Sequence, residues 1–171
     1  MYKVDSKDKV NELTEFPQSS VGAPIPLIIA SESKVSVAFY LNDIPEDWDG
    51  SEIKMVDSDS VEPVAIVTFD WCYAHYSGSP NDEAFSGHPL ASRGLGPYGS
   101  YEILNSSWIR TLESMNSVHP YHDKKRFMEN ARHFVLSFHD STFECIARDY
   151  TIHIEKGSIK DMIPKMTKLI L

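Results

Sequence analysis

The chain has few cysteines, few basic residues and no long apolar segment. Two cysteines in 171 residues exclude a disulfide framework, and we expect Cys72 and Cys145 to be thiols unless the compartment is oxidising. Sixteen basic residues against 25 acidic ones give a net charge of −9, which disfavours nucleic-acid backbones and anionic membranes as partners. Because it lacks both an apolar run of about 18 residues and the apolar core of a secretion signal, the sequence predicts a cytoplasmic protein.

The length predicts one domain over residues 1–171, which would bury roughly 70% of the surface that the unfolded chain exposes. Residues 1–20 are mostly polar and predict either a loose N-terminal arm or a short helix around residues 10–16. Residues 42–62 are acidic with few apolar side chains, so we expect them to form a solvated excursion.

Apolar periodicity predicts three strands before residue 77. Residues 25–30 and 34–41 are expected to form a hairpin, whose second strand alternates apolar and small or polar residues. One face of that strand carries Val35, Val37, Phe39 and Leu41. Residues 63–76 are rich in β-branched and aromatic side chains and predict a single long third strand.

Residues 77–100 hold five of the eight glycines and three of the ten prolines, which predicts a long loop. A loop of that length in a compact domain is often functional. Residues 94–99 satisfy the G-x-G-x-x-G pattern, but a dinucleotide site needs a preceding strand and a following helix. A loop precedes the pattern here, so a turn-rich loop is the favoured interpretation.

Two helices are expected between residues 105 and 128. Asn105 or Ser106 can cap the first, whose apolar residues recur at helical spacing at Trp108, Ile109, Leu112 and Met115. Residues 117–123 predict a turn, and Asp123 can cap the second helix. The first helix should therefore lie on a sheet.

The remaining elements complete the predicted fold. A strand is expected over 101–104 and a hairpin over 133–154, and Ser158 with Asp161 predicts a capping box for a last helix. Pro164 should kink or restart that helix. The order of the elements favours an α+β fold: an antiparallel sheet with two or three helices packed on it and one long Gly/Pro-rich loop.

Six of the seven histidines fall between His75 and His139, where an even distribution would place about three. Imidazoles titrate, bind metals and move protons near neutral pH, so candidate functional residues are sought in this part of the chain. His75 alternates with the apolar residues of its predicted strand, and His133 begins one. Both are interpreted as structural or exposed.

The hairpin 138–145 is the first candidate site. If Asp140 and Ser141 form its turn, Phe138 faces Phe143, Leu136 faces Cys145, and Cys145 is a buried thiol. The other face then carries His139 and Glu144, within reach of one another or of a shared ligand. Such a pair suits general acid-base chemistry, with His88 and Asp82 assisting. A simply solvated face is an equally open interpretation.

A metal site is the second candidate. His119, His122 and Asp123 lie within five residues, and zinc sites combine closely spaced imidazoles and carboxylates with distant ligands. The hypothetical site comprises His119, His122 and His139, with zinc as the candidate cofactor. The alternative, which the short Pro-containing turn favours, is that Asp123 is only a helix cap.

The loop 77–100 is the third candidate, as a ligand-binding segment. Its polar residues, Asn81, Asp82, Glu83, His88 and Arg93, include groups that bind cations or ligand hydroxyls. The alternative is turn chemistry, in which Asn and Asp side chains bond to their own backbone.

Four segments together resemble a family of uncharacterised small bacterial proteins: VGAPIPLIIA (21–30), PNDEAFSGHPLASRGL (80–95), NSSWIRTLESMNSVHPYH (105–122) and HFVLSFHDSTFECIA (133–147). The resemblance extends from about residue 20 to near the end of the chain. It implies no catalytic residue, cofactor or activity, so the functional hypotheses rest on the residues themselves.

Two functional hypotheses follow. The first is a non-catalytic acidic binding protein that meets a protein partner or small ligand through the 77–100 loop and the 138–145 hairpin, in the manner of immunity proteins that neutralise a basic toxin. The second is a small enzyme with His139 as base or metal ligand, assisted by Glu144, Asp82 and His88. The first is favoured because the second lacks a complete catalytic constellation.

Overall fold

Two antiparallel sheets pack face to face in the computed structural model, which describes residues 2–42 and 55–171. The five-stranded sheet has the order β1 (Lys9–Glu12), β6 (Ser100–Leu104), β7 (Arg132–Ser137), β8 (Thr142–Ala147), β5 (Ala74–Gly78). The four-stranded sheet has the order β2 (Leu27–Ala30), β3 (Lys34–Tyr40), β4 (Glu62–Asp70), β9 (Asp149–Gly157). The α+β prediction is confirmed, with two sheets in place of one.

The main core lies between the sheets, where alternate residues of each strand point inward. The predicted apolar face of β3 is confirmed, because Val35, Val37 and Phe39 are buried there with Leu41 beside them. They meet the apolar face of the β7–β8 hairpin, and the ring of Phe69 packs 5.4 Å from Phe134 and 5.7 Å from Phe143. Cys145 is a buried free thiol in this core, as predicted.

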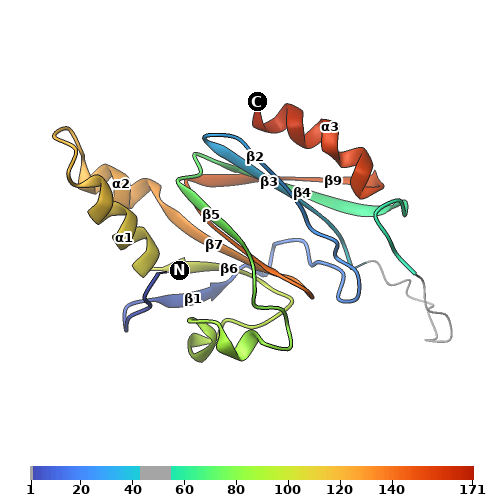
Figure 1. The fold of residues 1–171 in the computed structure, drawn as a ribbon, viewed down its shortest axis with the longest axis horizontal. Helices are drawn as coiled ribbons and strands as arrows, with labels where there is room; N and C mark the ends of the chain where they lie inside the picture. The colour runs from blue at the N-terminus through green and yellow to red at the C-terminus, as the bar shows by residue number, and fades with distance from the viewer. Residues whose placement is uncertain (1, 43–54) are drawn as a thin grey trace.

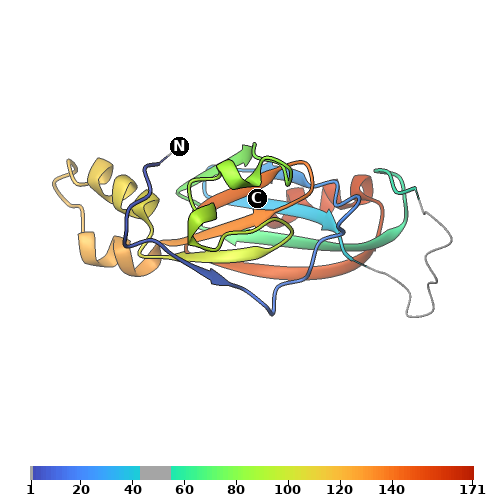
Figure 2. The same ribbon diagram turned by 90° about the horizontal axis from the view of Figure 1, so that it is seen from below.

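Each sheet is covered on its outer face. Helix α3 (Ile159–Ile170) packs on the four-stranded sheet, where Met162 and Met166 contact the outward side chains of β3 and β4. On the five-stranded sheet lie α1 (Ser107–Asn116), α2 (Lys124–Asn130) and two 3₁₀ turns, η1 (Phe85–Gly87) and η2 (Ala91–Arg93). Figure 1 shows α3 at the top, the 3₁₀ turns at the bottom, and α1 with α2 at one end. Figure 2, seen from below, shows α1 and α2 at the same end.

The helix caps are the predicted ones, and α3 differs from the prediction at Pro164. Ser106 caps α1, Asp123 caps α2, and Ser158 with Asp161 forms the predicted capping box of α3. Helix α3 nevertheless runs through Pro164 as one element, so of the predicted kink or restart the restart is wrong, and the kink stays a prediction. Burial of the apolar face of α3 against the sheet compensates for the backbone hydrogen bond that proline cannot donate. No helix in the described part of the chain is long and apolar enough to cross a membrane.

The predicted third strand over 63–76 is wrong, because it is two strands in different sheets. β4 ends at Asp70, Trp71 adopts a positive φ of 50°, and β5 begins at Ala74 beside β8. The chain makes a second crossover between β8 and β9. Apolar periodicity does not reveal such a corner, since the alternation of Val67, Phe69, Trp71 and Tyr73 in the sequence continues across it.

The N-terminal residues also differ from the prediction. Residues 10–16 form no helix; instead β1 pairs with β6, so part of the expected arm is an edge strand. The predicted acidic excursion over 42–62 falls largely on residues 43–54, which lie outside the described residues. The loop 77–100 is ordered by its two 3₁₀ turns, and Phe85, Leu90 and Leu95 bury their side chains against the sheet.

Candidate functional site

Glu144 lies on the outer face of the five-stranded sheet, in β8 beside the edge strand β5, with 1% of its surface exposed. Because side chains alternate along β8, Cys145 points into the core and Glu144 points away from it. Three segments cover Glu144: the N-terminal residues, the loop that carries η1 and η2, and the start of α1. Each contributes polar groups to the cluster around its carboxylate.

Three donors surround the carboxylate of Glu144. Its Oε1 lies 3.0 Å from Nε2 of His88, and its Oε2 lies 3.0 Å from Nε2 of His133. The hydroxyl of Tyr2 donates to Oε2 at 2.7 Å. We call Glu144, His88, His133 and Tyr2 the Glu144 cluster.

In each imidazole, the hydrogen bond at Nδ1 determines which ring nitrogen carries the proton. The backbone N–H of Leu90 donates to Nδ1 of His88 at 3.1 Å, so the ring proton of His88 must be on Nε2. Nδ1 of His133 lies 2.9 Å from Oγ of Ser106. That oxygen already accepts the N–H groups at the start of α1, so its hydroxyl proton is free to donate to His133. Both imidazoles are therefore neutral and donate their Nε2–H to Glu144.

Burial and hydrogen bonding set the charges of the cluster. Burial alone would raise the pKa of Glu144, but the hydrogen bonds from His133 and His88 outweigh it and lower the pKa to about 2. Burial lowers the pKa of His133, and burial together with the neighbouring Glu144 raises the pKa of Tyr2. At neutral pH the cluster consequently carries one negative charge and no positive one.

Asp8 fixes the segment that brings Tyr2 to this site. It is 2% exposed, its Oδ1 accepts the N–H of Ser107 at 2.6 Å, and its Oδ2 accepts the N–H of Asp5 at 2.8 Å. A carboxylate at the first turn of a helix is stabilised by the helix dipole. Residues 2–8 are therefore attached to the N-terminal end of α1.

A pocket of about 320 Å³ opens above the cluster, which falls within the range of small-ligand sites. Its floor includes Glu144, and its walls are mostly aromatic or apolar. Tyr2 stacks on Trp108 with ring centroids 5.2 Å apart, and Met115 is 65% exposed at the rim. The residues that line it are Tyr2, His75, Tyr76, Trp108, Thr111, Leu112, Met115 and Glu144. We call it the Glu144 pocket.

His139 does not share a strand face with Glu144. The hairpin pairs Leu136 with Phe143 and Ser137 with Thr142, so the predicted register is wrong by two residues and His139 lies in the turn. The predicted apolar face survives, because a shift of two preserves alternation. The residue that reaches Glu144 from β7 is His133, which the sequence interpretation set aside; on the observed register it is diagonal to Glu144 on the same face.

His139 belongs to a separate group at the tip of the hairpin. Its Nδ1 lies 2.9 Å from Asp140, its Nε2 lies 4.0 Å from Asp82, and Tyr98 donates to Asp82. The carboxylate of Asp140, opposed by slight burial, raises the pKa of His139. Of the four predicted catalytic residues, the structure thus joins His88 with Glu144, and His139 with Asp82.

The predicted ligand-binding residues of the loop act mainly in turns. Asn81 accepts the N–H of Ala84 at 3.1 Å, and Asp82 accepts the N–H of Glu83 at 2.8 Å. Glu83 is exposed, and Arg93 donates to the carbonyl of Asp8. Only His88 of this group reaches the Glu144 cluster.

The three predicted zinc ligands do not meet. His119 and His122 lie in the turn between α1 and α2, whereas His139 follows β7, whose six residues span roughly 20 Å. Nε2 of His122 instead lies 3.3 Å from Glu113. Within residues 2–42 and 55–171, no group of three His, Cys, Asp or Glu side chains is arranged to hold a metal ion.

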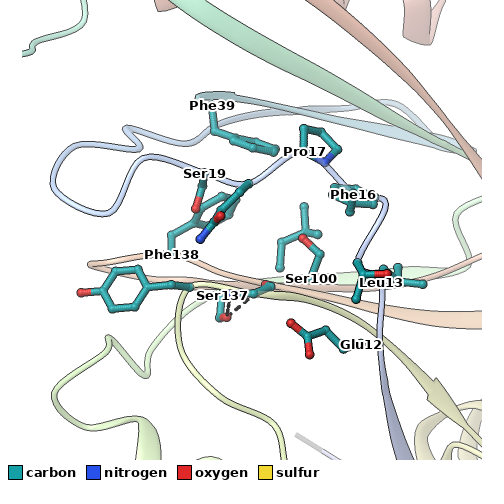
Figure 3. A pocket seen from close by; sticks show the side chains of 14 residues that line it. Glu12, Leu13, Phe16, Pro17, Ser19, Phe39, Ser100, Ser137 and Phe138 are labelled. Atoms are coloured by element: carbon teal, nitrogen blue, oxygen red, sulfur yellow. Dashed lines mark hydrogen bonds between the residues drawn. The ribbon is translucent and has the colours of Figure 1, made fainter. Parts of the chain in front are cut away.

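A smaller cavity lies between β3, the start of β6, the end of β7 and the segment that follows β1 (Figure 3). Its volume is about 130 Å³, and Phe16, Phe39 and Phe138 form its apolar wall. Ser137, on the opposite side, donates to the carbonyl of Gly96 at 2.8 Å and is part of the backbone structure of the loop. A cavity of this size accommodates a few water molecules, below the range of small-ligand sites.

Comparisons of the chain with protein-family models, with curated proteins and with solved structures gave no match. The resemblance of the four segments to a family of small bacterial proteins therefore stays a prediction.

Proposed function

We propose that this protein is a non-catalytic binding protein that holds an organic cation in the Glu144 pocket. The cation is either a small quaternary or primary ammonium compound or the Lys or Arg side chain of a basic protein partner. The observation that carries the proposal is an ionised carboxylate that lies beneath an open aromatic pocket while both of its imidazole neighbours are neutral. One negative charge therefore remains without a cationic counterpart.

Aromatic rings and a buried carboxylate are the two groups that recognise organic cations. Trp108, Tyr2 and Tyr76 line the pocket, and a cation over the free face of an aromatic ring gains about 0.5–2 kcal/mol. The carboxylate adds roughly 3 kcal/mol at about 6 Å and an effective dielectric constant near 20. Together these terms correspond to a dissociation constant near or below about 1 mM for a small cation.

The charges favour binding over catalysis. General acid-base catalysis works best with a pKa near the operating pH, and the pKa of Glu144 is about 2. Its oxygens already accept three hydrogen bonds, and His139 lies outside the cluster. The net charge of −9 also attracts cationic ligands and basic partners.

A titration with choline and its neutral isostere 3,3-dimethylbutanol tests the proposal. We expect choline to shift the indole N–H resonance of Trp108 with a dissociation constant of about 1 mM, and the neutral alcohol to bind at least about tenfold more weakly. If an arginine-rich peptide binds more tightly than choline, the natural ligand is a basic partner. Equal binding of choline and the alcohol would contradict the proposal.

Two substitutions test whether choline binds in the Glu144 pocket. Thr111→Lys places an ammonium group at the exposed lining of the pocket without altering the Glu144 cluster, so it should abolish choline binding. Glu144→Gln should remove the preference for choline over the alcohol. Glu83→Gln makes the same change in net charge at an exposed position and is expected to bind choline as the wild type does. Unaltered choline binding by Thr111→Lys would place the cation elsewhere.

A further inference from the structure

The two crossovers between the sheets lie side by side near α1 and α2. One passes from β4 to β5 through Trp71, and the other passes from β8 to β9 through Arg148, whose N–H donates to the carbonyl of Asp70 at 3.0 Å. Trp71 has a positive φ of 50°, uncommon for a bulky residue, and 61% of its surface is exposed. The crossover therefore holds an indole ring out into solvent in a fixed backbone conformation.

A pocket of about 530 Å³ lies between the corner formed by these two crossovers and the turn that joins α1 to α2. Tyr121, at the tip of that turn, is 89% exposed, and Tyr73 packs against Phe127 with ring centroids 5.0 Å apart. The side chains that matter here are Trp71, Tyr73, Tyr121, Arg126 and Arg148. We call it the corner pocket; it shares no lining residue with the Glu144 pocket.

The arginines of the chain differ in the polar partners of their side chains. Arg110 and Arg132 form ion pairs with carboxylates, and Arg93 donates to a backbone carbonyl. The other two, Arg126 and Arg148, make no side-chain hydrogen bond or ion pair within the described ranges, and both line the corner pocket. In a chain with 25 acidic residues, the two arginines whose side chains have no polar partner among the described residues thus line one concavity.

One carboxylate also lines the corner pocket, that of Asp123. Its Oδ1 accepts the backbone N–H of Arg126 at 3.0 Å as the cap of α2, and it forms no ion pair with either arginine. The pocket therefore has an excess of positive charge, whereas the chain as a whole is acidic.

We propose that the corner pocket binds a small aromatic anion, a planar ring that carries a phosphate or carboxylate group. The guanidinium fork matches both anions with paired N–H donors, and exposed aromatic rings stack on planar ligands. The volume is that of a site for one compact ligand. The proposal does not rest on the cation site, since it uses different residues and the opposite charge.

Calorimetric titrations of the wild type test separately whether the aromatic ring and the anionic group of a ligand contribute to its affinity. The probes are adenosine monophosphate, adenosine, inorganic phosphate and indole-3-carboxylate. We expect the nucleotide or the carboxylate to bind at least about tenfold more tightly than adenosine or phosphate, and more weakly as salt increases. Tighter binding of the nucleotide identifies a phosphate ligand, and tighter binding of the indole identifies a carboxylate ligand. Phosphate binding as tight as that of the nucleotide would overturn the role of the ring.

Matched variants test the arginines. Arg126→Gln and Arg148→Gln should each weaken binding of the better probe about tenfold or more, and the double variant should abolish it. Lys125→Gln removes the same charge from α2 at a residue outside the pocket and should bind as the wild type does. Circular dichroism confirms that each variant is folded. Absence of binding by every probe at millimolar concentration, or binding that is unchanged in the double variant, would overturn the proposal.

Discussion

Replacing Glu144 by leucine is expected to lower the free energy of unfolding by about 3 kcal/mol or more at pH 7. The substitution leaves the Nε2–H groups of His88 and His133 without an acceptor in the protein interior, and each orphaned buried donor costs about 1–3 kcal/mol. The hydroxyl of Tyr2 also loses its acceptor. Chemical denaturation at pH 7 measures the difference.

The same carboxylate predicts how stability depends on pH. The pKa of Glu144 is about 2 in the folded chain against an ordinary value of 4.5, which corresponds to roughly 3 kcal/mol. Because the folded value is the lower one, this stabilisation is complete above about pH 4.5 and is lost as the pH falls toward about 2. The pKa of His133 is also lowered, so stability should begin to decline already below about pH 6.5.

The leucine variant should therefore lose less stability than the wild type between pH 4.5 and pH 2, by about 3 kcal/mol. Glu83→Leu is the control, since that side chain is exposed and its replacement should change stability by less than about 0.5 kcal/mol. A leucine variant as stable as the wild type, with the same pH dependence, would show that Glu144 is not ionised and hydrogen-bonded in the folded protein.

Ser106→Ala is expected to destabilise the fold by about 2–4 kcal/mol, the second largest effect. Loss of the cap of α1 accounts for about 1 kcal/mol. The remainder arises because Nδ1 of His133, which is fully buried, loses its donor.

Ser158→Ala provides the matched comparison. Ser158 caps α3 through the N–H of Asp161 but contacts no buried imidazole, so its loss should cost only about 1 kcal/mol. Denaturation midpoints of the two variants give the comparison at constant pH. Equal costs for the two serines would indicate that the Ser106 hydroxyl does not donate to His133.

The positions of most helices and strands could be predicted from the sequence, but their arrangement in two packed sheets could not. Alternation placed Phe39 and Cys145 on apolar faces, and capping residues located α1, α2 and α3. The corner at Trp71 was missed because the alternation of large apolar and aromatic residues, from Val67 to Tyr73, continues across it in the sequence. The division into two sheets arises from long-range pairing, β4 with β9 and β5 with β8, which no local pattern encodes.

The candidate site was predicted in part. Glu144 and His88 were identified as polar residues near the histidine-rich region, and the structure joins them. His133 was missed because its role depends on the hairpin register, and the turn was predicted one residue too late, which shifts the pairing by two residues. A turn at His139 and Asp140 would have placed His133 diagonally opposite Glu144, whereas the predicted turn places His133 two residues farther along the same face. Tyr2 is 142 residues from Glu144, and no spacing in the sequence indicates that contact.

Long-range proton–nitrogen NMR of the histidine side chains tests most directly whether the negative charge beneath the Glu144 pocket is uncompensated. At pH 7 we expect His88 and His133 each to show one protonated nitrogen, Nε2, and one unprotonated nitrogen, Nδ1. That result leaves the negative charge of Glu144 uncompensated and available to a cation. Two protonated nitrogens on either ring would mean that an imidazolium already neutralises Glu144, and would contradict the proposed cation site.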